Sequence, residues 1–147
     1  MKIAVACDHA GYRLKGVLLE ELRNQGHEIV DFGTDSEASV DFPDYAVKAA
    51  RAVANGECER GIVICGTGIG VSISANKVHG IRCALCGDVF SAKATRAHND
   101  ANMLALGERV IGQGLAVEIM NAFLTTDYEG GRHDLRIKKM MAIEKEQ

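Results

Sequence analysis

The segment spanning residues 64–72 combines a thiol with a glycine-rich turn, and this pairing can do chemistry. Cys65 is followed by Gly66, Gly68 and Gly70. Such a loop can turn sharply and aim its N–H groups inward, and with a helix N-terminus behind it the loop binds anions. The same N–H groups and helix dipole stabilise a thiolate. Cys65 is therefore a candidate base or nucleophile. The alternatives are a tight turn without a ligand and a buried, inert thiol.

Known loops for nucleotides and phosphate esters do not fit the chain well. A dinucleotide fingerprint would need glycine in place of Val71 or Ile73, and no Gly-Lys-Ser/Thr follows as in a Walker A loop. Cys7 and Arg13 have the C-x5-R spacing of cysteine-dependent phosphatases. Those enzymes need a hydroxyl residue where Leu14 stands, and their low-molecular-weight class needs a late Asp-Pro that this chain lacks. A phosphatase is therefore a minor alternative.

Two further segments carry side chains suited to proton transfer. Asp8 and His9 follow the first apolar run, and a carboxylate beside an imidazole suits proton transfer or contact with an anion. The alternative is that Asp8 caps a helix and His9 lies on the surface. His98 and Asn99 stand where a helix is expected to end, and a helix C-terminus favours a protonated imidazole. A structural or solvated histidine is the alternative at that position.

A fourth segment provides two arginines after a glycine pair. Arg132 and Arg136 are four residues apart and so share one face of a helix. Two guanidinium groups suit a phosphate, because the planar fork matches its oxygens. The alternative is a solvated helix face on which the arginines pair with Glu129.

The elements that must position these residues alternate between strand and helix. We expect strands at 3–7, 28–32, 62–65, 81–86 and 102–106. We expect helices at 14–22, 43–56, 69–78, 89–97, 115–124 and 134–146. Right-handed crossovers then give an α/β fold, a three-layer α/β/α sandwich with a five-stranded parallel sheet (Rossmann-like) and an extra C-terminal helix. Such sheets bind ligands beyond the carboxyl ends of their strands, where Cys65 and Asp8 are expected.

Composition bounds the class of protein. The 147 residues are 47% hydrophobic and 25% charged, which fits one domain over 1–147 and excludes wholesale disorder. A net charge of −3 does not indicate a nucleic-acid surface. No apolar run reaches the ~18 residues of a membrane span, and the chain opens without a signal-peptide core, so we expect a cytoplasmic protein.

The five cysteines are expected to be free thiols, because their number is odd and the chain is large enough to fold without disulfides. Cys83 and Cys86 form a C-x-x-C, but on a strand residues three apart point to opposite faces. No second pair lies nearby, and no H-E-x-x-H is present. We therefore expect no metal site and no cofactor.

Taken together, these segments resemble the ribose-5-phosphate isomerase B family. The resemblance spans nearly the whole chain, in the family's order, and rests on residues 7–11, 64–72 with 75–77, 98–102 and 129–133 with Arg136. It implies a metal-free interconversion of ribose 5-phosphate and ribulose 5-phosphate through a cis-enediolate. It also implies a homodimer or tetramer with active sites at the dimer interface.

The resemblance assigns roles to individual residues. Cys65 would be the base that moves a proton between C1 and C2, and His98 would open the sugar ring. Asp8 would contact the sugar hydroxyls, and Thr67 could help a proton move between oxygens. The remaining implied substrate contacts are the backbone from Gly66 through Thr67, Gly68 and Ile69 to Gly70, then Asn99 and Arg109, and for the phosphate His9, Arg132 and Arg136.

Two positions depart from patterns within the family. One branch lacks the cysteine and uses a glutamate where Val71 stands, so Cys65 has no visible substitute. Many members have tyrosine where Phe42 stands, which leaves the sugar preference open. The alternatives are an isomerase of a six-carbon sugar phosphate (galactose 6-phosphate or allose 6-phosphate) and a non-catalytic sugar-phosphate-binding module.

Overall fold

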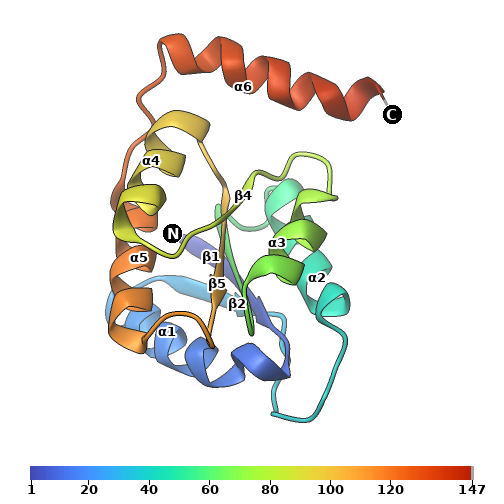
Figure 1. Cartoon of the computed structure of the whole chain (residues 1–147), viewed down its shortest axis with the longest axis vertical. Coiled ribbons are helices and arrows are strands. Elements are labelled where there is room, and N and C mark those ends of the chain that lie inside the picture. Colours follow the sequence, from blue (N-terminus) through green and yellow to red (C-terminus); the bar gives the residue numbers. More distant parts are fainter. Residues whose placement is uncertain (147) are drawn as a thin grey trace.

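The fold is built on one five-stranded parallel sheet, seen in a computed structural model that describes residues 1–146 (Figure 1). The strands are β1 (Lys2–Cys7), β2 (Glu28–Asp31), β3 (Arg60–Cys65), β4 (Cys83–Leu85) and β5 (Met103–Gly107). Their order is β2-β1-β3-β5-β4, and every neighbouring pair is parallel. The expected parallel α/β sheet is therefore confirmed.

Helices cover both faces of this sheet. They are α1 (Tyr12–Asn24), α2 (Phe42–Ala54), α3 (Ile69–Asn76), α4 (Val89–Asn99), α5 (Gln113–Thr125) and α6 (Arg132–Ala142), with short 3-10 turns η1 (His9–Gly11) and η2 (Ile143–Glu146). Successive side chains of β1 point to opposite faces of the sheet. Ile3 and Val5 pack in the core beneath α1, α4 and α5. Ala4 and Ala6 pack in the core beneath α2 and α3. Figure 1 shows these two helical layers on either side of the sheet.

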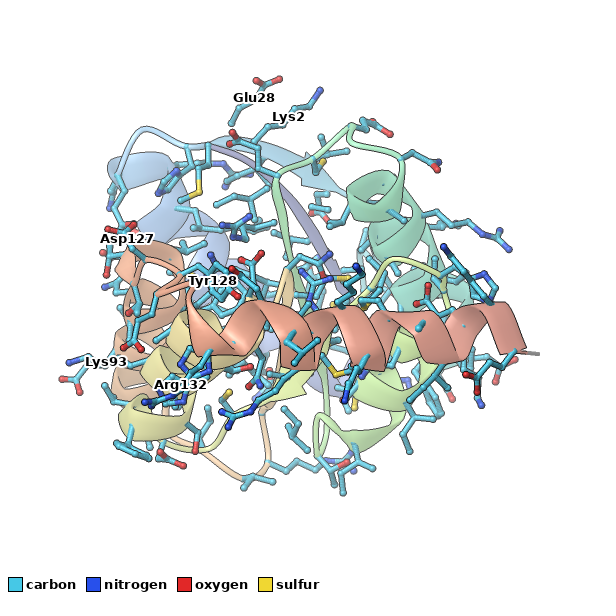
Figure 2. All side chains as sticks on the ribbon, turned by 90° about the horizontal axis from the view of Figure 1, so that it is seen from above. Lys2, Glu28, Lys93, Asp127, Tyr128 and Arg132 are labelled. Carbon is cyan, nitrogen blue, oxygen red and sulfur yellow. The ribbon has the colours of Figure 1, made fainter. Side chains whose placement is uncertain are left out.

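Helix α6 lies outside both layers. It crosses the edge of the sheet at which the strands begin, called the amino edge below (Figures 1 and 2). The segments on either side of it are attached to the body: the Glu129 N–H donates to the Ala97 carbonyl at 3.0 Å, and the Gly80 N–H donates to the Glu144 carboxylate at 2.9 Å. The opposite edge, where the strands end, is called the carboxyl edge.

The expected elements are all present, with shifted ends. The last helix, expected over 134–146, is α6 over Arg132–Ala142 followed by the 3-10 turn η2. Among the strands the largest difference is β4, expected over 81–86 and found over Cys83–Leu85. The Ile81 N–H closes a turn onto the Val78 carbonyl, and the Arg82 N–H donates to the side chain of Asn102. These two groups are therefore unavailable to the strand ladder. Among residues 1–146, no helix is long and apolar enough to cross a membrane.

Candidate active site

The thiol and the glycine loop meet at the carboxyl end of β3. Cys65 is the last residue of the strand, and α3 begins four residues later at Ile69. The Gly68 N–H donates to the Cys65 Sγ at 3.2 Å, and the Ile69 N–H donates to the Thr67 Oγ1 at the same distance. A backbone hydrogen-bond donor is thus aimed at the sulfur. The loop thus has the form expected from its sequence, with the thiol on its inner side.

Close packing requires glycine at Gly68 in this loop and at Gly107, which faces the loop from β5. Gly68 has φ +78°, in the left-handed region, and a Cβ there would lie 2.9 Å from the Leu106 carbonyl carbon. A Cβ on Gly107, at the end of β5, would lie 2.5 Å from the Thr67 carbonyl oxygen. The loop is therefore pressed against the backbone of β5, and this contact fixes the direction of its N–H groups.

Replacing Gly68 with alanine should destabilise the protein and distort the loop. A left-handed conformation costs a non-glycine residue about 1–3 kcal/mol, and overpacking costs a similar amount. We expect the free energy of unfolding to fall by about 2–4 kcal/mol in a denaturant titration. Gly87→Ala is the matched control, because a Cβ there meets nothing within 4 Å. If Gly68→Ala were as stable as Gly87→Ala, the packing argument would be wrong.

Asp8 and His9 lie beside the loop, after the end of β1. The Asp8 carboxylate accepts from the N–H groups of Ala10 (2.9 Å) and Gly11 (3.2 Å), so the helix-cap alternative is correct for one oxygen of this side chain. The His9 Nδ1 accepts from the Val40 N–H at 3.2 Å. In the neutral ring that bond places the proton on Nε2, which makes Nε2 a donor.

Arg109 joins the same region from the loop after β5. Its N–H donates to the Gly66 carbonyl at 2.9 Å, and its Nη1 lies 3.3 Å from where a Gly66 Cβ would stand. The guanidinium therefore lies over the glycine loop. Cys65, the loop 66–70, Asp8, His9 and Arg109 form what we call the carboxyl-edge set.

The other predicted residues gather around the ends of α4 and α6. His98 and Asn99 close α4, while Arg132 and Arg136 lie on the first turns of α6. All four are exposed. Figure 2 shows Arg132 at the start of α6, on the side of the molecule occupied by α4. We call these four residues the amino-edge set.

Glu129 and His133 complete this region, and neither was predicted as a site residue. The Glu129 Oε2 lies 3.3 Å from the His133 Nε2 and 4.0 Å from the His98 Nε2. The two imidazole rings stack with centroids 4.6 Å apart and planes at 16°. The alternative in which Glu129 pairs with the arginines is thus wrong: its carboxylate faces the histidines. The i,i+4 spacing of Glu129 and His133 was the signal that could have indicated the pair.

The two sets lie at opposite edges of the sheet in one chain. Register pairs Cys65 with Gly107 at the carboxyl edge, while the Gly61 N–H bonds to Asn102, next to the end of α4, at the amino edge. Four residues of strand separate these levels, roughly 13 Å at 3.3 Å per residue. The interior between them is filled by core side chains such as Ile62 and Leu104. A small ligand cannot contact both sets of the same chain.

The phosphatase alternative is contradicted by the structure. Cys7 is 1% exposed, and burial raises the pKa of its thiol to about 12. Arg13 points elsewhere, with its side chain 74% exposed and bonded to Glu37. A buried neutral thiol cannot act as a phosphatase nucleophile, because that step needs a thiolate.

Cys86, 2% exposed, has its pKa raised by burial to about 11, as expected for a structural thiol. It packs with the α1, α4 and α5 layer and Cys83 with the other, so the two face opposite sides of the sheet.

Comparison with known proteins decides the family. A family model described as Ribose/Galactose Isomerase matches residues 3–140. The chain belongs to this family. Among its relatives is ribose-5-phosphate isomerase B of Escherichia coli, 50% identical over 143 residues that cover 97% of this chain and 96% of the relative. The resemblance found in the sequence is therefore confirmed, and the chain is an isomerase.

Solved structures of the family share the whole fold. Ribose-5-phosphate isomerase B of Clostridium thermocellum is 53% identical, with a TM-score of 0.98 over 99% of both chains. The Mycoplasma genitalium enzyme, solved with bound ribulose-5-phosphate, is 39% identical with a TM-score of 0.94, covering 99% of this chain and 97% of that one. The family fold therefore extends from β1 to α6.

Proposed function

We propose that this chain interconverts ribose 5-phosphate and ribulose 5-phosphate without a metal, through a cis-enediolate. The observation that carries the proposal is the thiol of Cys65 at the start of the glycine loop, with the Gly68 N–H 3.2 Å from its sulfur. Membership of the isomerase family and its ribulose-5-phosphate-bound member support the substrate class. We place the enzyme, as one domain over 1–147, in the cytoplasm, where its five free thiols would stay reduced.

The chemistry follows from the loop. The Cys65 thiolate removes the proton from C2 of the open-chain aldose and returns it to C1, and Thr67 helps a proton move between the two oxygens. The intermediate carries negative charge on adjacent oxygens, and the N–H groups between Gly66 and Gly70 stabilise that charge. Loss of one such donor in other enzymes costs about 3–4 kcal/mol of transition-state stabilisation.

The remaining residues open and hold the sugar. His98 moves the proton that opens the furanose ring, and Asp8 contacts the sugar hydroxyls with the carboxylate oxygen not used in its cap. His9, through Nε2, binds the phosphate together with Arg132 and Arg136. Asn99 and Arg109 complete the substrate contacts. Binding far from the reacting carbons positions the substrate for proton transfer.

This assignment needs two chains, because the carboxyl-edge and amino-edge sets of one chain cannot share a ligand. We infer a homodimer in which each site combines the carboxyl-edge set of one protomer with the amino-edge set of its partner. An apolar surface next to the loop supports such a contact. Its members surround the edge strand β4 and are strongly exposed: Ile69 (51%), Ile73 (55%), Leu85 (43%) and Phe90 (80%). Leu85 lies against Gly68, so a partner docked there reaches the glycine loop.

The direct test is turnover of ribose 5-phosphate by the purified enzyme with a chelator present. We expect ribulose 5-phosphate to form at a rate the chelator does not lower. Activity only on allose 6-phosphate or galactose 6-phosphate would show that the substrate is a six-carbon sugar phosphate and not ribose 5-phosphate. Binding of ribose 5-phosphate without turnover of any of these sugars would contradict the enzyme assignment and favour a binding module.

A further inference from the structure

We propose that His98, Glu129 and His133 form a zinc site through which the free ion inhibits the enzyme. One ligand atom from each of the three residues lies within 4.8 Å of the other two. Two imidazole nitrogens and one carboxylate oxygen are the donor set of many zinc centres that keep one position open. Nitrogen donors favour zinc over magnesium or calcium. The inhibitory part rests on the proposed function, since it involves the histidine assigned to ring opening.

The cluster is partly preorganised. His133 is held in place, with its side chain only 7% exposed. The backbone of Glu129 is held to the end of α4 by its bond to Ala97. The Glu129 Oε2 already lies 3.3 Å from one histidine nitrogen. Donor atoms around a tetrahedral zinc at about 2.0–2.1 Å are separated by similar distances.

The movement required falls on the exposed members: the His98 ring must rotate out of its stack on His133, because a metal ion binds in the plane of each imidazole. The 4.0 Å between Glu129 Oε2 and His98 Nε2 must shorten. His98 and Glu129 have side chains 45% and 57% exposed, so both can rotate without disturbing the core. With neutral imidazoles the three ligands carry one negative charge, which favours a dication. Arg132 and Arg136 on the same segment oppose it, but they are exposed and solvent screens them.

Zinc bound here occupies the His98 Nε2. That imidazole can then neither accept nor deliver the ring proton, and the ion stands at the start of α6 beside Arg132. Binding of zinc should therefore inhibit turnover of the cyclic sugar phosphate, and a chelator should restore it.

Zinc binding can be measured by calorimetry on the full chain, independently of activity. We expect one zinc per chain, with the affinity lowered at least about tenfold by Glu129→Gln, because even loss of an outer-shell partner costs 10- to 100-fold. His133→Ala should lower the zinc affinity likewise, but it leaves a cavity at a buried position. Glu129→Gln is conservative and exposed, so this variant is the one that tests the site. His79→Ala, an exposed histidine outside the cluster, is the matched control and should bind as the wild type does.

Three results would overturn the proposal. The first is equal zinc affinity in Glu129→Gln and the wild type. The second is a thiolate-to-metal charge-transfer band with Co²⁺ as the probe, which would place the ion at a cysteine. The third is an active enzyme that binds zinc at this cluster without inhibition. If zinc binds as expected but no sugar phosphate is turned over even with chelator, the metal site stands and the proposed function fails.

Discussion

Cys65→Ala is expected to lower kcat for ribose 5-phosphate by about 10²- to 10⁴-fold, the usual contribution of a general base. The sulfur is the group assigned to carry the C2 proton, and alanine leaves the N–H groups of the loop in place. Substrate binding should therefore persist, with a Kd within a few fold of the wild type. Steady-state kinetics, with calorimetric binding of ribose 5-phosphate to the variant, measure both quantities.

Cys7→Ala is the matched control for that experiment. Cys7 ends β1 as Cys65 ends β3, but it is buried and its pKa is raised to about 12. It contributes no thiolate near neutral pH, so its loss should leave kcat within about twofold. Near-normal turnover by Cys65→Ala would show that another group is the base.

Arg136→Ala should raise KM by about 10- to 100-fold, because a hydrogen bond to a charged group contributes about 1.5–3 kcal/mol. The guanidinium is assigned to the phosphate, far from the reacting carbons. Its loss should therefore weaken binding far more than Cys65→Ala does, while kcat falls less than in that variant. Initial rates over a wide range of ribose 5-phosphate concentration separate the two parameters.

Lys139→Ala controls for the loss of one positive charge from the same helix. Lys139 is exposed and lies in the last turn of α6, away from His98. Its removal should change KM by less than about twofold. If Arg136→Ala and Cys65→Ala raised KM equally, or if Lys139→Ala matched Arg136→Ala, the phosphate assignment would be wrong.

The sequence predicted much of the fold because its signals are local. Buried parallel strands such as β3 appear in the sequence as short apolar runs. The glycines after Cys65 indicate a turn whatever the rest of the chain contacts. The N–H bond to the Cys65 sulfur lies within that turn, and its direction is fixed by the packing of the loop against β5. The Asp8 cap was one of two alternatives, since a side chain that caps a helix and one that contacts a ligand have the same local sequence.

Other features depend on contacts that are distant along the chain. Strand order sets which loops are neighbours, so the position of Arg109 over Gly66 required the pairing of β3 with β5. The separation of Cys65 from His98 depends on α4 running back to the amino edge. The approach of Glu129 to His98 depends on how the segment before α6 bonds to Ala97. None of these could be obtained from spacing.

Each active site is proposed to take residues from two chains. This arrangement can be tested by co-expressing Cys65→Ala and Arg136→Ala chains that carry different affinity tags. Two successive affinity steps, one for each tag, then isolate the mixed dimer. The account predicts one site with an intact set from each chain, so kcat/KM per dimer recovers to about half that of the wild type. If each site lay within one chain, the mixed dimer would reach only the mean of the activities of Arg136→Ala and Cys65→Ala, and that result would show that the site does not span two chains.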